Sequence, residues 1–170
     1  WTYGAIPQQQ ETAETDPYAG KYFELTPDRV FGSSGSAEGQ LTMPRGLAVA
    51  ADGSVYVADA NNHRIQKFSA DGAFLLSWGS YATAEGGNAP GGTFNEPWGV
   101  AVAPDGSVYV ADTWNHRIQK FTRDGKFLTM WGVPGLAEEP DRFWGPRGIA
   151  VDREGTVYVT DTGNNRVVIF

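Results

Sequence analysis

Three aspartates recur at equivalent places in the sequence, each five residues before an arginine. The pairs are Asp59 with Arg64, Asp112 with Arg117, and Asp161 with Arg166. A ring of carboxylates is able to hold a divalent cation, which is the chemistry such a pattern would serve in an enzyme. A carboxylate also accepts backbone N–H bonds in the turn that follows it and orients an arginine beside it. Because every repeat has this Asp–Arg pair, we assign the pair to the structure of the repeat and predict no metal site.

Two histidines occupy equivalent places in neighbouring repeats, His63 and His116, and the third repeat has Asn165 there. Metal ligands must converge on one point, whereas equivalent positions around a ring diverge unless they face its axis. We therefore interpret these histidines as turn-capping or packing residues. Two histidines and no cysteine leave few candidates for a general base or a nucleophile, so the sequence favours a protein that is not an enzyme.

Tryptophan and arginine are the residues that most often anchor interfaces, and both occur where the repeats are joined. Ordinary burial of the tryptophans and solvation of the arginines stay open as the alternative. With the two histidines, these side chains form the predicted binding surface, which consists of Arg45, His63, Trp98, Trp114, His116 and Arg147.

These residues lie on a repeated unit. The unit GLAVAADGSVYVADANNHRIQKFSADGAFLLSWG at residues 46–79 returns almost unchanged at 99–132 and, shortened, at 148–170. Four apolar segments alternate with turns in the first copy, and we expect them to be strands at 47–50, 54–58, 64–68 and 74–78. Asp-Gly between such segments is the strongest short hairpin signal. A four-stranded antiparallel meander that recurs at this length predicts the blades of an all-β propeller.

A single blade cannot bury both of its faces, so apolar residues must fill the space between blades. No segment has the pattern of a helix. The residues predicted to lie between blades are Val49, Val55, Val57, Ile65 and Phe68, with their equivalents Val102, Val108, Val110, Ile118 and Phe121.

The domain organisation follows from the repeat. Residues 1–20 are polar and irregular and predict an extended N-terminal arm, and residues 21–170 form the propeller part. The predicted segments of that part are a stray outer strand at 21–32, blades at 41–79 and 94–132, and an incomplete blade at 143–170. The last blade lacks its outer strand, which leaves an unpaired edge that must be covered. Two copies of the chain would make a six-bladed ring, and a fragment of a longer propeller is the equal alternative.

The pattern P-x-G-[LVI]-A-V, D-G-x-V-Y-V-x-D, N-[HN]-R-[IV] and a closing aromatic-Gly resembles the NHL repeat. The resemblance covers residues 41–170, about three-quarters of the chain. It implies a propeller, most often of six blades. It also implies a binding or scaffolding role, since most members have one. A minority of related propellers are lyases or lactonases with a divalent cation in the central channel, and some relatives bind RNA through a basic face.

The residues and the resemblance together leave three candidate functions for this chain. The first is a non-catalytic protein-interaction or assembly module, with a protein partner or a second copy that completes the propeller and contacts made by its loop-rich face. The second is a metal-dependent lyase or lactonase, in which calcium or zinc would be the cofactor. Arginine and tryptophan where the channel begins would repel a cation, which argues for the first. The third, RNA binding, would need a local patch of Arg45, Lys67, Lys120 and Arg147.

Composition bounds the remaining possibilities. The formal net charge of the 170 residues is −7, which makes broad attraction to nucleic acid or anionic lipid unfavourable. No apolar run approaches the ~18 residues that cross a bilayer, so no membrane insertion is expected. An acidic, cysteine-free repeat chain without an initiator methionine resembles extracytoplasmic or membrane-tethered bacterial proteins.

Overall fold

The computed structural model describes Gly20 and residues 26–84, 89–136, 139 and 141–170. The chain divides into two compact units, residues 1–30 and residues 31–170, and all the strands described lie in the second. The predicted arm at 1–20 falls outside the described residues except for Gly20. Of the predicted stray strand at 21–32, residues 26–32 are described and form no regular secondary structure.

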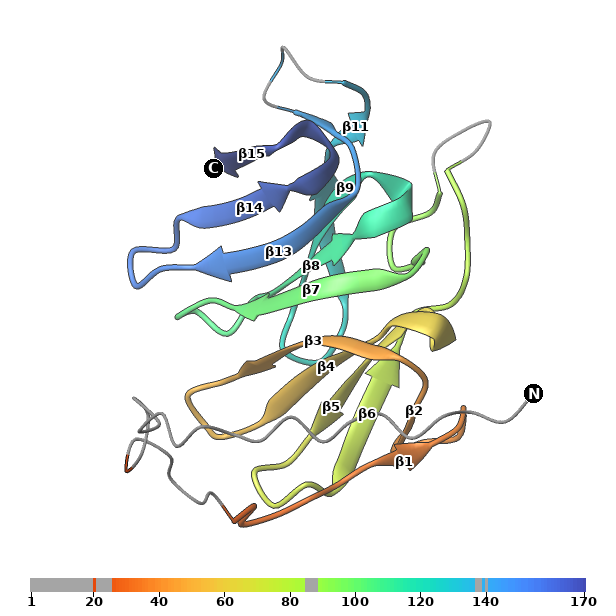
Figure 1. Cartoon of the computed structure of the whole chain (residues 1–170), viewed down its shortest axis with the longest axis vertical. Coiled ribbons are helices and arrows are strands. Elements are labelled where there is room, and N and C mark those ends of the chain that lie inside the picture. The colour runs from red at the N-terminus through yellow and green to blue at the C-terminus, as the bar shows by residue number, and fades with distance from the viewer. Residues whose placement is uncertain (1–19, 21–25, 85–88, 137–138, 140) are drawn as a thin grey trace, which may run out of the picture. The chain divides into compact units, whose positions relative to one another are not determined.

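Two four-stranded antiparallel sheets follow one another along the second unit (Figure 1). The first consists of β3 (Pro44–Val49), β4 (Val55–Asp59), β5 (Arg64–Phe68) and β6 (Phe74–Trp78). The second consists of β7 (Pro97–Val102), β8 (Val108–Asp112), β9 (Arg117–Phe121) and β10 (Phe127–Trp131). Each sheet is a meander of neighbouring strands, as the sequence predicts, and its third and fourth strands begin and end at the predicted residues.

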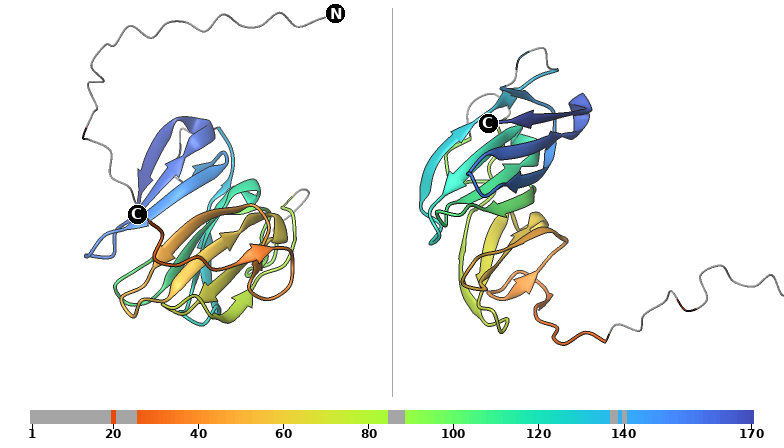
Figure 2. Two further views of the ribbon diagram at one scale, coloured as in Figure 1. Left: turned by 60° about the horizontal axis from the view of Figure 1, so that its bottom comes forward. Right: turned by 90° about the vertical axis from the view of Figure 1, so that its left-hand side faces the viewer.

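The third sheet has three strands, β13 (Pro146–Val151), β14 (Val157–Asp161) and β15 (Arg166–Ile169). Two short parallel pairs precede the first and third sheets. These are β1 (Ser33–Ser34) with β2 (Gln40–Leu41), and β11 (Val133–Pro134) with β12 (Arg142–Phe143). Figure 2 shows the three sheets from two other sides, each turned against the next as successive propeller blades. The innermost strands β3, β7 and β13 lie side by side (Figure 1).

The tight turns between the first two strands of each blade explain why these segments pair. Gly53, Gly106 and Gly155 have φ values of 81°, 82° and 91°, a backbone conformation that favours glycine. The Ser54 N–H donates to Asp52 Oδ1 at 3.0 Å. This hydrogen bond is the main reason that the pKa of Asp52 lies below its ordinary value. The turn chemistry thus confirms the hairpins that the Asp-Gly signal predicts.

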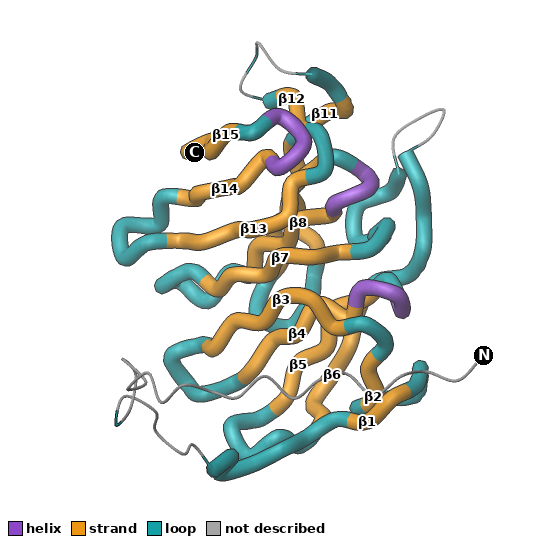
Figure 3. The backbone as a smooth tube through the Cα atoms, in the orientation of Figure 1, coloured by secondary structure: helices purple, strands orange, loops and turns teal. Residues whose placement is uncertain are grey.

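Helical structure in the described residues is confined to three single 3₁₀ turns, drawn in purple in Figure 3. They are η1 (Ala60–Asn62), η2 (Thr113–Asn115) and η3 (Thr162–Asn164), each between the second and third strand of its blade. The sequence itself predicts no helix. A single turn of three residues has no room for a repeating apolar pattern, so periodicity did not detect it.

Two hydrophobic clusters fill the spaces between the blades. Residues of the first and second blades form one cluster, and residues of the second and third blades form the other. Nine of the ten predicted interblade residues are buried or half-buried, and Val49 is the exception because 62% of its surface is exposed. Its counterpart Val102 packs against the preceding blade. No blade precedes the first sheet within the described residues, so Val49 has nothing equivalent to pack against.

Candidate functional site

Each blade is locked by one buried aspartate. In the first blade, Asp59 Oδ2 accepts hydrogen bonds from Arg64 Nε at 2.7 Å and from the side-chain amide of Gln66 at 2.9 Å. Its other oxygen accepts the Thr42 N–H at 2.7 Å. The carboxylate therefore ties the third strand and the chain that leads into the blade to the end of the second strand.

The same lock recurs in the other two blades. Arg117 Nε donates to Asp112 Oδ2 at 2.8 Å, and Arg166 Nε donates to Asp161 Oδ2 at 3.0 Å. All three carboxylates are fully buried. Burial raises the pKa of Asp112, and hydrogen bonds from the Asn95 backbone and the Asn115 side chain act in the opposite direction. Each of these buried aspartates thus joins segments of its own blade through several hydrogen bonds.

The two histidines and Asn165 close the 3₁₀ turns in a left-handed backbone conformation, with φ values of 52°, 54° and 53°. His63 and His116 then reach to the following blade. His63 Nδ1 accepts the Glu96 N–H at 3.1 Å, and His116 Nδ1 accepts the Gly145 N–H at 3.0 Å. Burial lowers the pKa of His116. Each histidine thus accepts a backbone N–H through Nδ1 and joins two blades at the loop-rich face.

A hollow of about 550 Å³ opens on the loop-rich face between the second and third blades. The rings of His116 and Trp144 stack at 4.8 Å, and the indole N–H of Trp114 donates to Glu96 Oε2 at 3.2 Å. Trp114 is 43% exposed and Trp144 46% exposed. We call this the aromatic hollow, and its lining consists of Thr83, Ala84, Asn95, Trp114, His116, Pro134 and Trp144.

A second hollow, of about 470 Å³, lies where the three innermost strands begin. The guanidinium carbons of Arg45 and Arg147 each lie 4.3 Å from the centroid of the Trp98 ring. The two arginines come from the first and third blades and the tryptophan from the blade between them. We call these three residues the arginine–tryptophan cluster.

Glycines hold that cluster in place. A Cβ atom on Gly46 would lie 2.4 Å from the Trp98 carbonyl oxygen, and one on Gly99 would lie 2.3 Å from the Arg147 carbonyl oxygen. No real Cβ approaches backbone so closely, so the innermost strands pack backbone against backbone at these points. The side chains of the cluster are consequently mounted on closely spaced strands.

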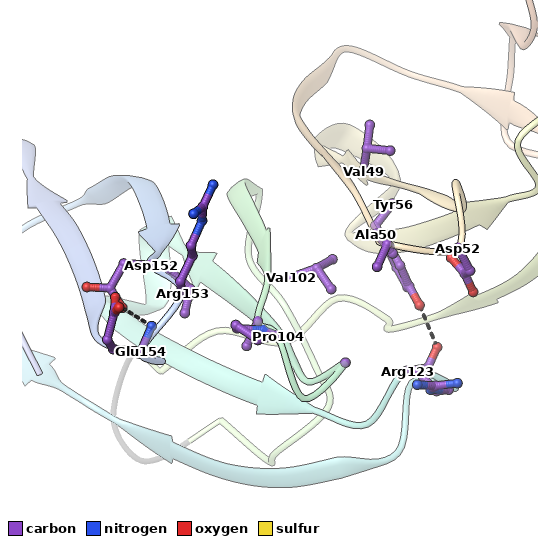
Figure 4. Close-up of a pocket in the computed structure, with 14 residues that line it drawn as sticks. Val49, Ala50, Asp52, Tyr56, Val102, Pro104, Arg123, Asp152, Arg153 and Glu154 are labelled. Atoms are coloured by element: carbon purple, nitrogen blue, oxygen red, sulfur yellow. Dashed lines mark hydrogen bonds between the residues drawn. The ribbon is translucent and has the colours of Figure 1, made fainter.

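The opposite, tight-turn face has a hollow of about 630 Å³ lined by the first turns of all three blades (Figure 4). Its charges have both signs, with Asp52, Asp152 and Glu154 beside Arg123 and Arg153. The Tyr56 hydroxyl donates to the Arg123 carbonyl oxygen at 3.0 Å, which ties the first blade to the second here. The lining of this hollow thus combines three acids with two arginines.

The family model described as NHL repeat matches this chain three times, at residues 41–68, 94–121 and 143–170. Each match covers the first three strands of one blade. The chain belongs to the NHL-repeat family.

Two proteins of different names and organisms are similar in sequence to these NHL repeats. Protein brain tumor from Drosophila melanogaster is 35% identical over 105 residues, which is 61% of this chain and 10% of that protein. Peptidylglycine alpha-amidating monooxygenase from Rattus norvegicus is 33% identical over 110 residues, 62% of this chain and 11% of that enzyme. The chain thus spans about a tenth of the length of these relatives.

Solved structures of similar fold are β-propellers. The WD40 beta propeller domain of Doa1 has a TM-score of 0.55 and 16% identity, with 75% of this chain and 36% of that chain covered. Virginiamycin B lyase from Staphylococcus aureus has a TM-score of 0.52 and 20% identity, with coverages of 73% and 36%. At these identities the likeness shows the propeller fold alone.

The structure brings the predicted binding residues of the NHL repeats into separate groups. Arg45, Trp98 and Arg147 lie together, and Trp114 lies beside the same hollow as His116. His63 instead packs against Tyr81, with ring centroids 4.7 Å apart.

Trp144 is not among the binding residues predicted from the sequence. It stands where the other two repeats have Thr42 and Asn95, since the N–H of each donates to the aspartate of its own blade. An aromatic residue at a position that is otherwise small and polar is a signal that a comparison of the repeats position by position would have found.

Other predicted features of the NHL chain bear on metals and membranes. Among the described residues, no three His, Asp or Glu side chains are grouped so that they could hold a metal ion. Glu139 accepts a hydrogen bond from Arg142 Nε at 3.1 Å. No helix in the described part of the chain is long and apolar enough to cross a bilayer.

Proposed function

We propose that this chain is a non-catalytic protein-interaction module that binds a partner protein through the aromatic hollow of its loop-rich face. One observation carries the proposal. The two half-exposed indoles of the hollow, Trp114 and Trp144, are both departures from the repeat. Trp114 replaces Asn61 of the first blade and Gly163 of the third, as the alignment of the repeats shows. We interpret exposed tryptophans that depart from the repeat as anchors for contacts outside it.

The chemistry of the hollow supports recognition rather than catalysis. His116 is its titratable side chain, and the Gly145 N–H already occupies its Nδ1 atom. Burial also lowers the pKa of this imidazole, which favours its neutral form. Half-exposed tryptophans beside a concave surface are typical anchors of protein interfaces.

The experiment is a selection of peptides from a random displayed library on the immobilised chain. We expect the selected peptides to bind wild type and to lose affinity by about tenfold or more in Trp114→Ala/Trp144→Ala, the range of a hot spot. The control variant is Leu75→Ala/Leu128→Ala, which removes two exposed apolar side chains from outer strands. Peptides that bind the tryptophan variant as well as wild type, or a selection without enrichment, would overturn the proposal.

Within the same proposal, a second copy covers the open faces of the first and third blades. Val167 and Ile169 are 61% and 59% exposed, whereas Ile118, the counterpart of Val167 in the second blade, is fully buried. On the other open face, Leu47 is 65% exposed, and its counterpart Val100 is 5% exposed. The two open faces correspond to the two faces that meet between successive blades, so each face fits the other face of a second copy. Further blades of a longer chain would cover them equally well.

The two alternative functions, a metal-dependent enzyme and an RNA-binding protein, would need different features of the structure. A metal-dependent propeller enzyme would require a cation near the channel, where the described strands begin with the arginine–tryptophan cluster. The basic patch that RNA binding would use is not formed by the four residues considered for it. Lys67 and Lys120 lie over Tyr56 and Tyr109, with distances of 5.1 and 5.0 Å to the ring centroids. Neither lysine lines the hollow of Arg45 and Arg147.

A further inference from the structure

We infer that the arginine–tryptophan cluster is a binding site for one compact anionic group, a carboxylate or a phosphate. The two guanidinium carbons lie at the same distance, 4.3 Å, from the centroid of the Trp98 ring. They are therefore no farther apart than twice that distance. A single carboxylate or phosphate at the edge of the ring can reach N–H groups of both arginines, because each guanidinium presents a planar fork of donors.

The donors of these two arginines are unused in the described structure. Arg45 and Arg147 have no ion pair or side-chain hydrogen bond with any described residue. The contrast with the arginine of the first-blade lock is sharp, since Arg64 donates to Asp59 and to two backbone carbonyls. An arginine stacked on an indole keeps the edge of its guanidinium free for an anion.

The cluster is held in position before any ligand arrives. Trp98 is partly buried, and its indole nitrogen is enclosed without a hydrogen-bond partner among the described residues. The innermost strands that carry the three side chains touch backbone to backbone at Gly46 and Gly99. Binding would therefore order little more than the ends of two arginine side chains, and the loss of conformational entropy would be small.

The charges favour a compact anion over a polyanion. The lining of the hollow is Arg45, Gly46, Trp98, Gly99, Arg147 and Gly148, with Ile149, and it has two positive charges and no acid. The chain as a whole has a formal net charge of −7. An extended nucleic acid would meet that negative charge over most of its length, whereas a single carboxylate or phosphate meets the arginines alone.

The test is a titration of the isotope-labelled chain followed by NMR at constant ionic strength. Sodium phosphate and sodium acetate are the two probes, and sodium chloride is the reference. We expect saturable shifts of the Arg45 and Arg147 Nε–H signals and of the Trp98 indole signal with at least one probe. The probe that gives the tighter binding decides between a phosphate and a carboxylate as the natural group.

Matched variants distinguish a specific anion-binding site from a general effect of positive charge. Arg45→Gln/Arg147→Gln is expected to weaken binding by about tenfold or more, and Arg45→Lys/Arg147→Lys to weaken it as well because lysine lacks the fork. The control Arg123→Gln/Arg153→Gln makes the same change in net charge on the tight-turn face and should bind as wild type does. The Trp114→Ala/Trp144→Ala variant should also bind the probe, so this inference and the proposed function can fail separately.

Three results would overturn the inference. The first is shifts with chloride that equal those with phosphate and acetate. The second is equal loss of binding in the Arg123/Arg153 control. The third is binding of a single-stranded RNA oligonucleotide that depends on Arg45 and Arg147 and is much tighter than binding of either probe, which would identify a polyanion site instead.

Discussion

The ring of Phe31 lies against the ring of Phe68, with centroids 5.1 Å apart. Trp78 has the same relation to Phe121 at 5.7 Å. Trp78 ends the outer strand of the first blade, and Phe121 ends the third strand of the second. Phe31 thus occupies the place that the last outer-strand residue of a preceding blade would occupy.

This contact predicts an effect on stability. We expect Phe31→Ala to lower the free energy of unfolding by about 1 to 3 kcal/mol, below the range for a fully buried phenylalanine because Phe31 is 37% exposed. Chemical denaturation followed by fluorescence measures it. The neighbouring Val30→Ala, at a side chain that is 82% exposed, should change the value by no more than about 0.5 kcal/mol. Equal effects of the two substitutions would contradict the packing role of Phe31.

Association through the open faces is tested by the mass in dilute solution, measured by light scattering on a sizing column. We expect twice the chain mass of 18.4 kDa for wild type and a shift toward the single-chain mass for Val167→Lys, which places a charge on the open face of the third blade. Leu128→Lys adds the same charge at an exposed outer-strand residue and should keep the larger mass. A monomeric wild type would instead support blades of a longer chain as the cover.

Substitution of Asp112 tests the aspartate lock. Asp112→Asn removes the charge that compensates Arg117, whose side chain is 5% exposed. Because an unpaired buried charge remains, we expect a loss of about 3 to 5 kcal/mol of unfolding free energy. Asp105→Asn is the control, since its contact with Lys120 is 3.9 Å long and exposed, and a change within about 1 kcal/mol is expected. A tolerated Asp112→Asn would show that the lock contributes little.

The histidine link predicts a dependence on pH. Burial lowers the pKa of His116 from its ordinary value of 6.5, so the unfolded chain binds a proton more readily than the folded chain. The contribution of His116 to stability is therefore present above pH 6.5 and is lost as the pH falls through 6.5 toward the lower folded-state value.

The variant for this test is His116→Asn, because Asn165 holds the same left-handed conformation in the third blade. We expect its unfolding free energy to fall less than that of wild type between about pH 7 and 5. An NMR titration of the His116 ring should give a midpoint below 6.5. Identical pH profiles of the two proteins would contradict the link.

Metals provide the fifth prediction. A cation that binds the folded chain alone must raise the unfolding temperature. We expect the midpoint to be the same with calcium, with zinc and with a chelator, because the arginine–tryptophan cluster stands where the channel begins. A rise with calcium or zinc that the chelator reverses would favour the metal-dependent enzyme instead.

Much of the fold was predictable because interactions between residues close in the sequence determine it. Asp-Gly turns between alternating apolar segments fix the hairpins, and repetition in register fixes the blades. One wrong prediction, burial of Val49, treated the first blade as if it had a neighbour on both sides. Burial depends on which blade stands next to which, and a repeat read by itself does not contain that information.

The candidate sites were predictable in part. The sequence named Arg45, Trp98 and Arg147 as members of one surface because arginine and tryptophan commonly anchor contacts. It did not show that both arginines lie over the same ring, since these residues are about fifty positions apart and meet only when three blades pack side by side. It also missed Trp144, whose stacking on His116 joins two different blades.

By itself, then, the sequence determined the unit: four short strands, their turns and the aspartate that belongs to each blade, all set by contacts within about forty residues. The tertiary structure alone decided what stands between the units. The aromatic hollow, the arginine–tryptophan cluster and the open faces of the first and third blades all arise where one blade meets, or lacks, the next. The physical reason is that backbone pairing acts within a blade, whereas side-chain packing joins residues from different blades.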